Sequence, residues 1–185
     1  MRRIGTLVGI AVVIAGCAAY SLVGPHPMTI AGLYTVEPQI PWSAATYGKW
    51  EIWTVDGPSL QSVQFLTGLE DGKALFRGKD EEKRPKFLKT MTASEIMELV
   101  VDSVSVAGGQ KVNAVNLRPE KFGAAQGFRF EMTYLTKTGL EKQAIVAGAV
   151  LNERLYLIVY SGAREHYYAK HKDHADRIIE SIRLK

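Results

Sequence analysis

The sequence of 185 residues contains a single cysteine, Cys17. An intrachain disulfide needs two thiols, so the fold must be stabilised by its hydrophobic core alone. Common enzyme signatures are also missing: there is no GxSxG motif of a serine nucleophile and no HExxH motif of a zinc peptidase. The stretch from Gly68 to Ala74 is one residue too short for a phosphate-binding loop. Any catalytic site would therefore have to be assembled from dispersed residues.

The chain also lacks a strong excess of charge of either sign. It holds 23 lysines and arginines against 19 acidic residues, a net charge of +4. If Arg2 and Arg3 leave with a leader peptide, 21 basic and 19 acidic residues remain, a net charge of +2. A nearly neutral domain is not typical of nucleic-acid binding, so no nucleic-acid partner is expected.

The N-terminus has the layout of an export signal. Arg2 and Arg3 precede an apolar run from Ile4 to Ile14, and the small residues Ala15 and Gly16 follow. A basic start, an apolar segment and a small-residue end are typical of a secretory signal peptide.

Residues 14–17, Ile-Ala-Gly-Cys, resemble the lipobox of bacterial lipoproteins. The resemblance implies that residues 1–16 are removed, that the thiol of Cys17 receives a diacylglycerol, and that the new N-terminus is acylated. Two or three acyl chains would hold the protein stably at a membrane, whereas one chain binds only marginally. Because Ala18 and not aspartate follows the cysteine, the resemblance favours the periplasmic face of the outer membrane wherever the cell has two membranes.

Two other interpretations of the N-terminus stay open. Ile4 to Val23 is a stretch of twenty residues without charge, long enough to cross a bilayer as an uncleaved signal anchor. A plain cleaved signal peptide would instead release a soluble protein.

Behind the leader, residues 17–28 are expected to form a lipidated end and a short tether. Pro25 and Pro27 favour extended backbone there. Residues 29–185 are expected to form one globular domain, a normal size for a single core.

Alternating apolar residues predict strands, and two segments predict helices. A capping box at Thr92 to Glu95 starts the first helix, which Gly108 and Gly109 should end. The second helix should run from about 164 to 181. Short connections favour antiparallel pairing. The prediction is an α+β fold with an antiparallel sheet of about six or seven strands, flanked by two helices. The expected strands are 49–55, 62–69, 73–77, 112–117, 128–135, 140–150 and 154–160, the last being central, and residues 29–36 are expected to form a further strand or an extended lead-in.

This element order resembles the PsbP-like α+β sandwich. The resemblance includes the strand–helix ending, from YLIVYSGAREHYY at residues 156–168 through IIESIRL at residues 178–184. It implies an accessory or assembly protein without an active site, and it implies no role for any particular residue.

The polar residues offer few candidates for a metal or catalytic site. His166, His171 and His174, with Asp173 nearby, are the best metal candidates, but their spacing does not gather three ligands on one helix face. A solvated helix face is the preferred interpretation, so neither a metal nor a cofactor is expected. Ser59 follows a turn without a base nearby in sequence, and no catalytic residue is assigned.

Trp42, Trp50 and Trp53 are the only tryptophans of the chain and lie within twelve residues. They could form an aromatic surface for a partner protein or a lipid interface. The alternative is that they belong to the core.

These features together predict a lipid-anchored, non-enzymatic protein of the cell envelope that binds or helps to assemble other envelope proteins. Two alternatives remain. One is a membrane-tethered hydrolase with a dispersed active site. The other is a carrier of a small ligand or lipid, which requires an apolar cavity between the sheet and a helix.

Overall fold

The structure is a computed structural model that describes residues 20–78 and 81–185. The leader, the lipobox and Cys17 lie outside the described residues, so the lipid anchor remains a prediction. Within the described ranges, neither α-helix is long and apolar enough to cross a bilayer.

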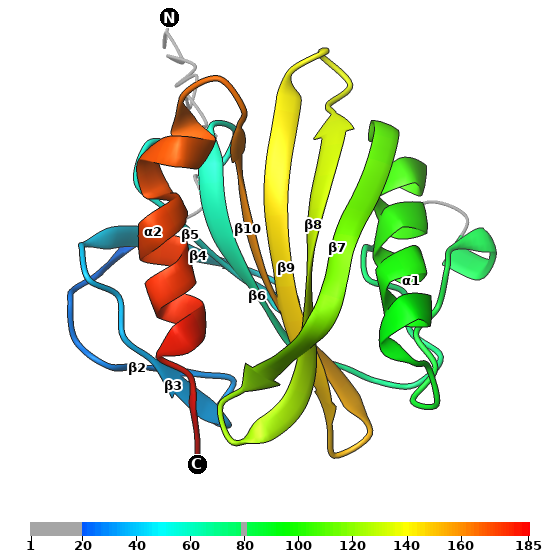
Figure 1. Ribbon diagram of the computed structural model, residues 1–185, viewed down its shortest axis with the longest axis horizontal. Helices are drawn as coiled ribbons and strands as arrows, with labels where there is room; N and C mark the ends of the chain where they lie inside the picture. Colours follow the sequence, from blue (N-terminus) through cyan, green and yellow to red (C-terminus); the bar gives the residue numbers. More distant parts are fainter. Residues whose placement is uncertain (1–19, 79–80) are drawn as a thin grey trace, which may run out of the picture.

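A strongly twisted sheet of eight strands forms the centre of the domain (Figure 1). Every neighbouring pair in it is antiparallel. The strands, in their spatial order, are β1 (Ser21–Val23), β4 (Trp42–Tyr47), β5 (Trp50–Thr54), β6 (Gln61–Leu69), β10 (Arg154–Ala163), β9 (Glu141–Leu151), β8 (Ala125–Leu135) and β7 (Gln110–Phe122). The predicted central position of the last long strand is confirmed, because β10 lies between β6 and β9.

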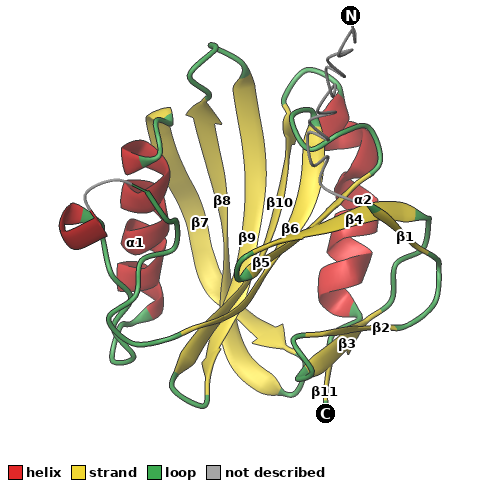
Figure 2. Ribbon diagram, turned by 180° about the vertical axis from the view of Figure 1, so that it is seen from behind, coloured by secondary structure: helices red, strands yellow, loops and turns green. Residues whose placement is uncertain are grey.

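A second, smaller sheet contains β11 (Arg183–Leu184), β3 (Tyr34–Val36) and β2 (Met28–Ile30). The helices are α1 (Ala93–Val106), α2 (Tyr167–Glu180) and a short 3-10 turn, η1 (Glu81–Lys83). Figure 2 shows α1 and α2 on opposite sides of the large sheet. The α+β class with an antiparallel sheet and two helices is thus confirmed.

The two α-helices cover opposite faces of the large sheet. Tyr156, Ile158 and Tyr160 of β10 belong to the core under α2, together with the apolar side chains of the small sheet. Leu155 and Leu157 alternate with them and belong to the core under α1. Strand β10 therefore contributes one face to each of two hydrophobic cores.

Local sequence explains why α1 begins where it does. The Thr92 hydroxyl accepts a hydrogen bond from the Glu95 amide at 3.3 Å, and the Glu95 carboxylate accepts one from the Thr92 amide at 2.7 Å. This reciprocal capping box satisfies two amides that the helix itself leaves unpaired. Ile96, Leu99 and Val100 then point into the core at helical spacing.

Three expectations about the fold need correction. The tether is shorter than residues 17–28, because β1 pairs with β4 at the edge of the large sheet. Residues 73–77 do not form a strand and contribute only an isolated bridge from Ala74 to Lys86. The strand count is higher than predicted because β1, β4 and β11 were not anticipated and because the expected stretch 29–36 forms two strands, β2 and β3.

Candidate functional site

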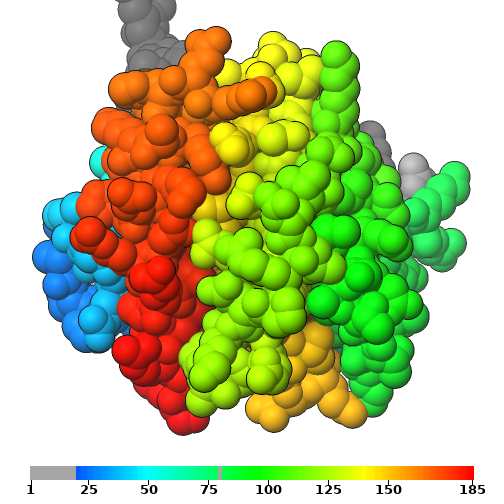
Figure 3. Space-filling view, in the orientation of Figure 1, coloured from blue at the N-terminus to red at the C-terminus, as the bar shows by residue number. Residues whose placement is uncertain are grey.

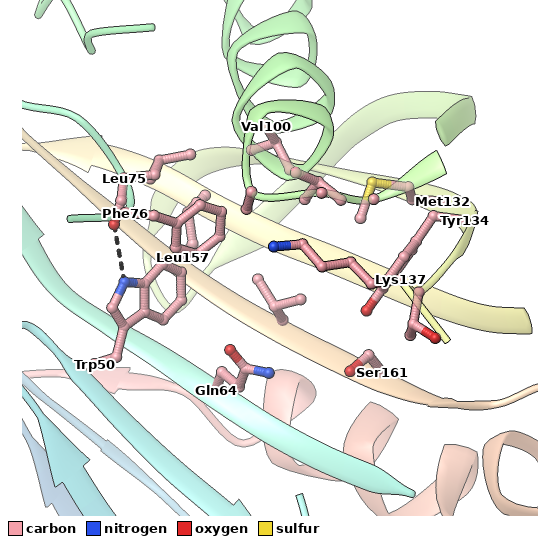
Figure 4. Close-up of a pocket in the computed structure, with 16 residues that line it drawn as sticks. Trp50, Gln64, Leu75, Phe76, Val100, Met132, Tyr134, Lys137, Leu157 and Ser161 are labelled. Carbon is pink, nitrogen blue, oxygen red and sulfur yellow. Dashed lines mark hydrogen bonds between the residues drawn. The ribbon is translucent and has the colours of Figure 1, made fainter. Parts of the chain in front are cut away.

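A pocket of about 420 Å³ opens beside α1, on the face of the sheet that this helix covers. The helix packs mainly against β7 and to a smaller extent against β8, and its side chains share a core with residues of β6 and β10. Figure 4 shows the space between α1, the sheet and the loop after β6. Its volume falls within the range of small-molecule sites in proteins.

Most of the lining is apolar and comes from elements far apart in the sequence. The helix and the turn after it supply Val100, Val104, Ala107, Gly108 and Gly109. The sheet supplies Trp50, Gln64, Met132, Tyr134, Leu157, Val159 and Ser161. The loop after β6 supplies Leu75 and Phe76, and the β8–β9 turn supplies Thr136 and Lys137.

One wall of the pocket is aromatic. The rings of Trp50 and Phe76 are stacked, with centroids 5.7 Å apart and planes 20° apart. The indole Nε1 of Trp50 also donates a hydrogen bond to the Leu75 carbonyl oxygen at 3.1 Å. The ring pair and the hydrogen bond together fix the loop against β5.

Hydroxyl and amide groups lie on the sheet side of the pocket. Burial raises the pKa of Tyr134, and a hydrogen bond with Ser161 partly offsets that rise. The phenol is therefore protonated at neutral pH and can donate a hydrogen bond. The Gln64 Nε2 donates to the Ser62 Oγ at 3.0 Å, which leaves its amide oxygen available. These groups could orient a ligand that has a polar end.

Lys137 extends over the pocket from the β8–β9 turn (Figure 4). It passes so close to Gly108 that a Cβ there would lie 1.9 Å from the Lys137 Cε. Among the described residues that line the pocket, Lys137 alone carries a charge.

A second lysine, Lys142, lies on the same sheet face but does not line the pocket. It is only 4% exposed, and burial lowers its pKa. Its Nζ donates to the Leu60 carbonyl oxygen at 3.3 Å. Within the described chain no hydrogen bond joins Lys142 to Ser161, so the two do not form a nucleophile and base in this conformation.

The histidines of the sequence analysis lie on and beside α2, on the other face of the sheet. His171 is 5% exposed, and its Nε2 lies 2.7 Å from an oxygen of Asp56. His166 is exposed at the start of α2, and its ring contacts Tyr167. His174 lies one turn from His171, with ring centroids 6.2 Å apart. The expected solvated face is thus wrong for His171, because that side chain packs under the helix.

The described residues contain no group of three metal-ligating side chains close enough to hold a metal ion. Instead, Asp56 joins Lys170 and His171. A hydrogen bond from Lys170 holds the pKa of Asp56 below its usual range, and burial, which acts in the opposite direction, is outweighed. Burial lowers the pKa of His174. This cluster ties the β5–β6 turn to α2 and is best explained by stability.

The three tryptophans have different environments. Trp42 and Trp53 are buried in the core under α2, at 1% and 0% exposure. They therefore do not form the exposed surface that the sequence could have supported. Trp50 is half-buried and faces the pocket on the α1 side.

Sequence reasoning did not locate the pocket, although it named the type of cavity that a carrier would need. The lining residues are brought together by the twist of the sheet and by the loop after β6. The one local signal was Gly108-Gly109, which was interpreted only as the end of the helix.

No protein-family model and no curated protein matches this chain. Among solved structures, the chain is similar to the cyanobacterial PsbP protein (CyanoP) of Synechocystis sp. PCC 6803, with a TM-score of 0.52 and 13% identity. That match covers 98% of this chain and all of the other.

Two weaker similarities have TM-scores of 0.41 and 0.45. One is to LpqN of Mycobacterium tuberculosis, described as involved in cell envelope biogenesis, with 8% identity over 93% of this chain and 87% of the other. The other is to the Ran-binding protein Mog1p of Saccharomyces cerevisiae, with 12% identity over 91% and 96%. The similarity to CyanoP, at 13% identity, shows the fold alone: the domain has the PsbP-like α+β fold.

Proposed function

We propose that this chain is a non-enzymatic binding protein of the bacterial cell envelope, anchored by lipid on Cys17, and that it carries a small, largely apolar ligand in the pocket beside α1. The observation that supports it is the pocket itself. It has a fixed aromatic wall, mostly apolar lining and a few convergent polar groups, a combination typical of ligand sites. The proposal specifies the accessory role that the fold resemblance implies.

A hydrolase is less well supported by the same geometry. Catalysis by a serine needs a base within hydrogen-bond reach. Ser161 is the serine that lines the pocket, and the buried amine on the same sheet face, Lys142, donates to the Leu60 carbonyl. The polar groups of the pocket are thus suited to binding a ligand.

Filling the pocket tests the proposed function. The chain from Ala18 onward keeps every contact described here and is free of acyl chains that would compete for the site. We expect phenylnaphthylamine, a neutral probe whose fluorescence rises in apolar sites, to bind this chain. Val104→Trp places an indole in the pocket, so it should weaken binding by at least about tenfold, or roughly 1.4 kcal/mol.

Val106→Trp is the matched control, because Val106 lies on the same helix but is 52% exposed and does not line the pocket. It should bind the probe as the unsubstituted chain does, and thermal unfolding should show that both variants fold. Equal binding by the two variants, or no binding by the unsubstituted chain, would exclude the pocket as the site.

The lipid anchor is tested separately in a bacterial host by mass spectrometry of the full chain. The unsubstituted protein should lose residues 1–16 and gain the mass of a diacylglycerol, since the thiol is the acceptor. Cys17→Ser should do neither, whereas Ala19→Ser should be processed normally. An unmodified Cys17 on a mature, freely diffusing product would refute the anchor without affecting the pocket.

A further inference from the structure

Lys137 is the one charged side chain among the described residues that line the pocket. Its turn is well ordered by hydrogen bonds: the Thr136 amide donates to the Leu140 carbonyl at 2.9 Å, and the Leu140 amide donates to the Thr136 Oγ1 at 3.0 Å. Gly139 takes a φ of +82°, which favours glycine. This turn directs Lys137 back over the mouth of the pocket instead of away from it.

Gly108 makes room for the lysine. The side chain lies across the backbone of Gly108, where any Cβ would overlap it. Figure 4 shows the ammonium reaching over the pocket in the direction of Trp50 and Phe76. The lysine thus lies above an apolar space, although it remains exposed to solvent on its outer side.

No acidic residue balances this charge at the pocket. The described ion pairs of the chain involve other basic residues, and the described lining contains no carboxylate. On the sheet side, the hydroxyls of Tyr134 and Ser161 could donate to a negatively charged group. An apolar space with one unpaired cation at its mouth is complementary to a molecule with an apolar tail and a single anionic head.

We infer that the pocket binds an anionic single-chain amphiphile, with its head at Lys137 and its tail between α1 and the Trp50–Phe76 wall. The inference rests on the proposed function and specifies its ligand. A carboxylate and a phosphate monoester share the chemistry that Lys137 recognises, so both head groups belong to the class.

Another role for Lys137 would be to stabilise the end of α1, where a cation interacts favourably with the helix dipole. That role predicts that Lys137→Met lowers the thermal unfolding temperature and that the pocket has no preference for anions. The two roles therefore differ in a measurable way.

The test compares four competitors of phenylnaphthylamine on the chain from Ala18 onward, below their micellar concentrations: decanoate, decyl phosphate, decanol and decyltrimethylammonium. At low salt, at least one of the two anions should bind about fivefold more tightly than decanol, an effect expected of one partly exposed ion pair. Added salt should reduce the preference. Which anion is preferred then distinguishes a carboxylate from a phosphate head.

Lys137→Met should abolish the anion preference while leaving the affinity for decanol unchanged, and Lys137→Glu should shift the preference to decyltrimethylammonium. Lys121→Met is the matched control, because Lys121 is exposed near the far end of β7 and does not line the pocket. It should keep the preference.

The outcomes separate this inference from the proposed function. If the probe and decanol bind but neither anion is preferred, or if Lys137→Met keeps the preference, the inference is overturned and the apolar pocket stands. If neither the probe nor any competitor binds, the proposed function fails, and the inference fails with it.

Discussion

The two faces of the large sheet are covered in different ways. On one face, α2 packs over β10, β9 and β6, and the small sheet completes the cover. In the space-filling view α2 (orange to red) adjoins the light-green end of β7 (Figure 3). Ile182 and Leu184 close this junction against Gly123. On the other face, α1 lies towards the β7 edge, and the pocket occupies the space beside it.

Strand β10 shows how the sequence produces this difference. Its α2 side carries Tyr156, Ile158 and Tyr160, and the Tyr160 hydroxyl donates to the Tyr168 carbonyl at 2.7 Å. Its α1 side ends in smaller residues, Val159 and Ser161, which line the pocket. Large side chains fill one face and small ones leave space on the other. The closed face can therefore provide stability, while the open face leaves space for the proposed ligand.

The largest difference in stability should appear between substitutions of two tryptophans of β5 whose side chains lie on opposite faces of the sheet. Trp53 packs edge-on against Phe65 in the closed core, with ring centroids 4.6 Å apart. Trp53→Ala should lower the free energy of unfolding by about 3–5 kcal/mol. Trp50→Ala should lower the free energy of unfolding by only roughly 1–2 kcal/mol, because that ring is half-buried. Urea unfolding measures both values.

For ligand binding, the order of the two variants should be reversed. Trp50→Ala removes the aromatic wall and should weaken phenylnaphthylamine binding, whereas folded Trp53→Ala should retain it. Equal losses of stability in the two variants would contradict the division into a closed and an open face.

Much of the fold could be predicted because its signals are local. The capping box at Thr92, the alternation from Phe128 to Leu135 and the apolar strand that became β10 each specify one element through its own sequence. β4 was missed because Pro38 and Pro41 mark a break and its centre is Ala44-Ala45, which gives little alternation. β1 and β11 have only three and two residues, too short for a pattern.

The site could be predicted only as a type of cavity. Its walls depend on how far α1 extends over the sheet and on where the loop with Phe76 packs against β5. No local sequence pattern determines either of these. The burial of His171 was missed for the same reason. Its partner, Asp56, lies 115 positions away in the sequence, and only the packing of α2 brings them together.

A smaller effect, and one that depends on pH, should come from the ion pair that ties α2 to the sheet. Arg129 of β8 donates to Asp176 of α2, which also accepts from Lys172 at 2.6 Å. Burial would raise the pKa of Asp176, but the hydrogen bonds from Lys172 and Arg129 outweigh it and lower the pKa. Asp176→Asn should lower the free energy of unfolding at pH 7 by about 2–3 kcal/mol, less than for a fully buried pair.

The sign of the pH dependence follows from this lowered pKa. Folding favours the ionised carboxylate, so its contribution is complete above the pKa of the unfolded chain, about 3.9, and is lost as the pH falls through the lower folded value. The difference in stability between the unsubstituted chain and Asp176→Asn should therefore be largest at neutral pH and should shrink below about pH 4. Asp102→Asn, at an exposed position of α1, should show almost no difference at any pH. Protonation of Asp176 breaks the ion pair, so the difference in free energy of unfolding should disappear at low pH if the pair is stabilising. A difference that stays constant down to pH 2 would mean that the pair does not stabilise the closed face.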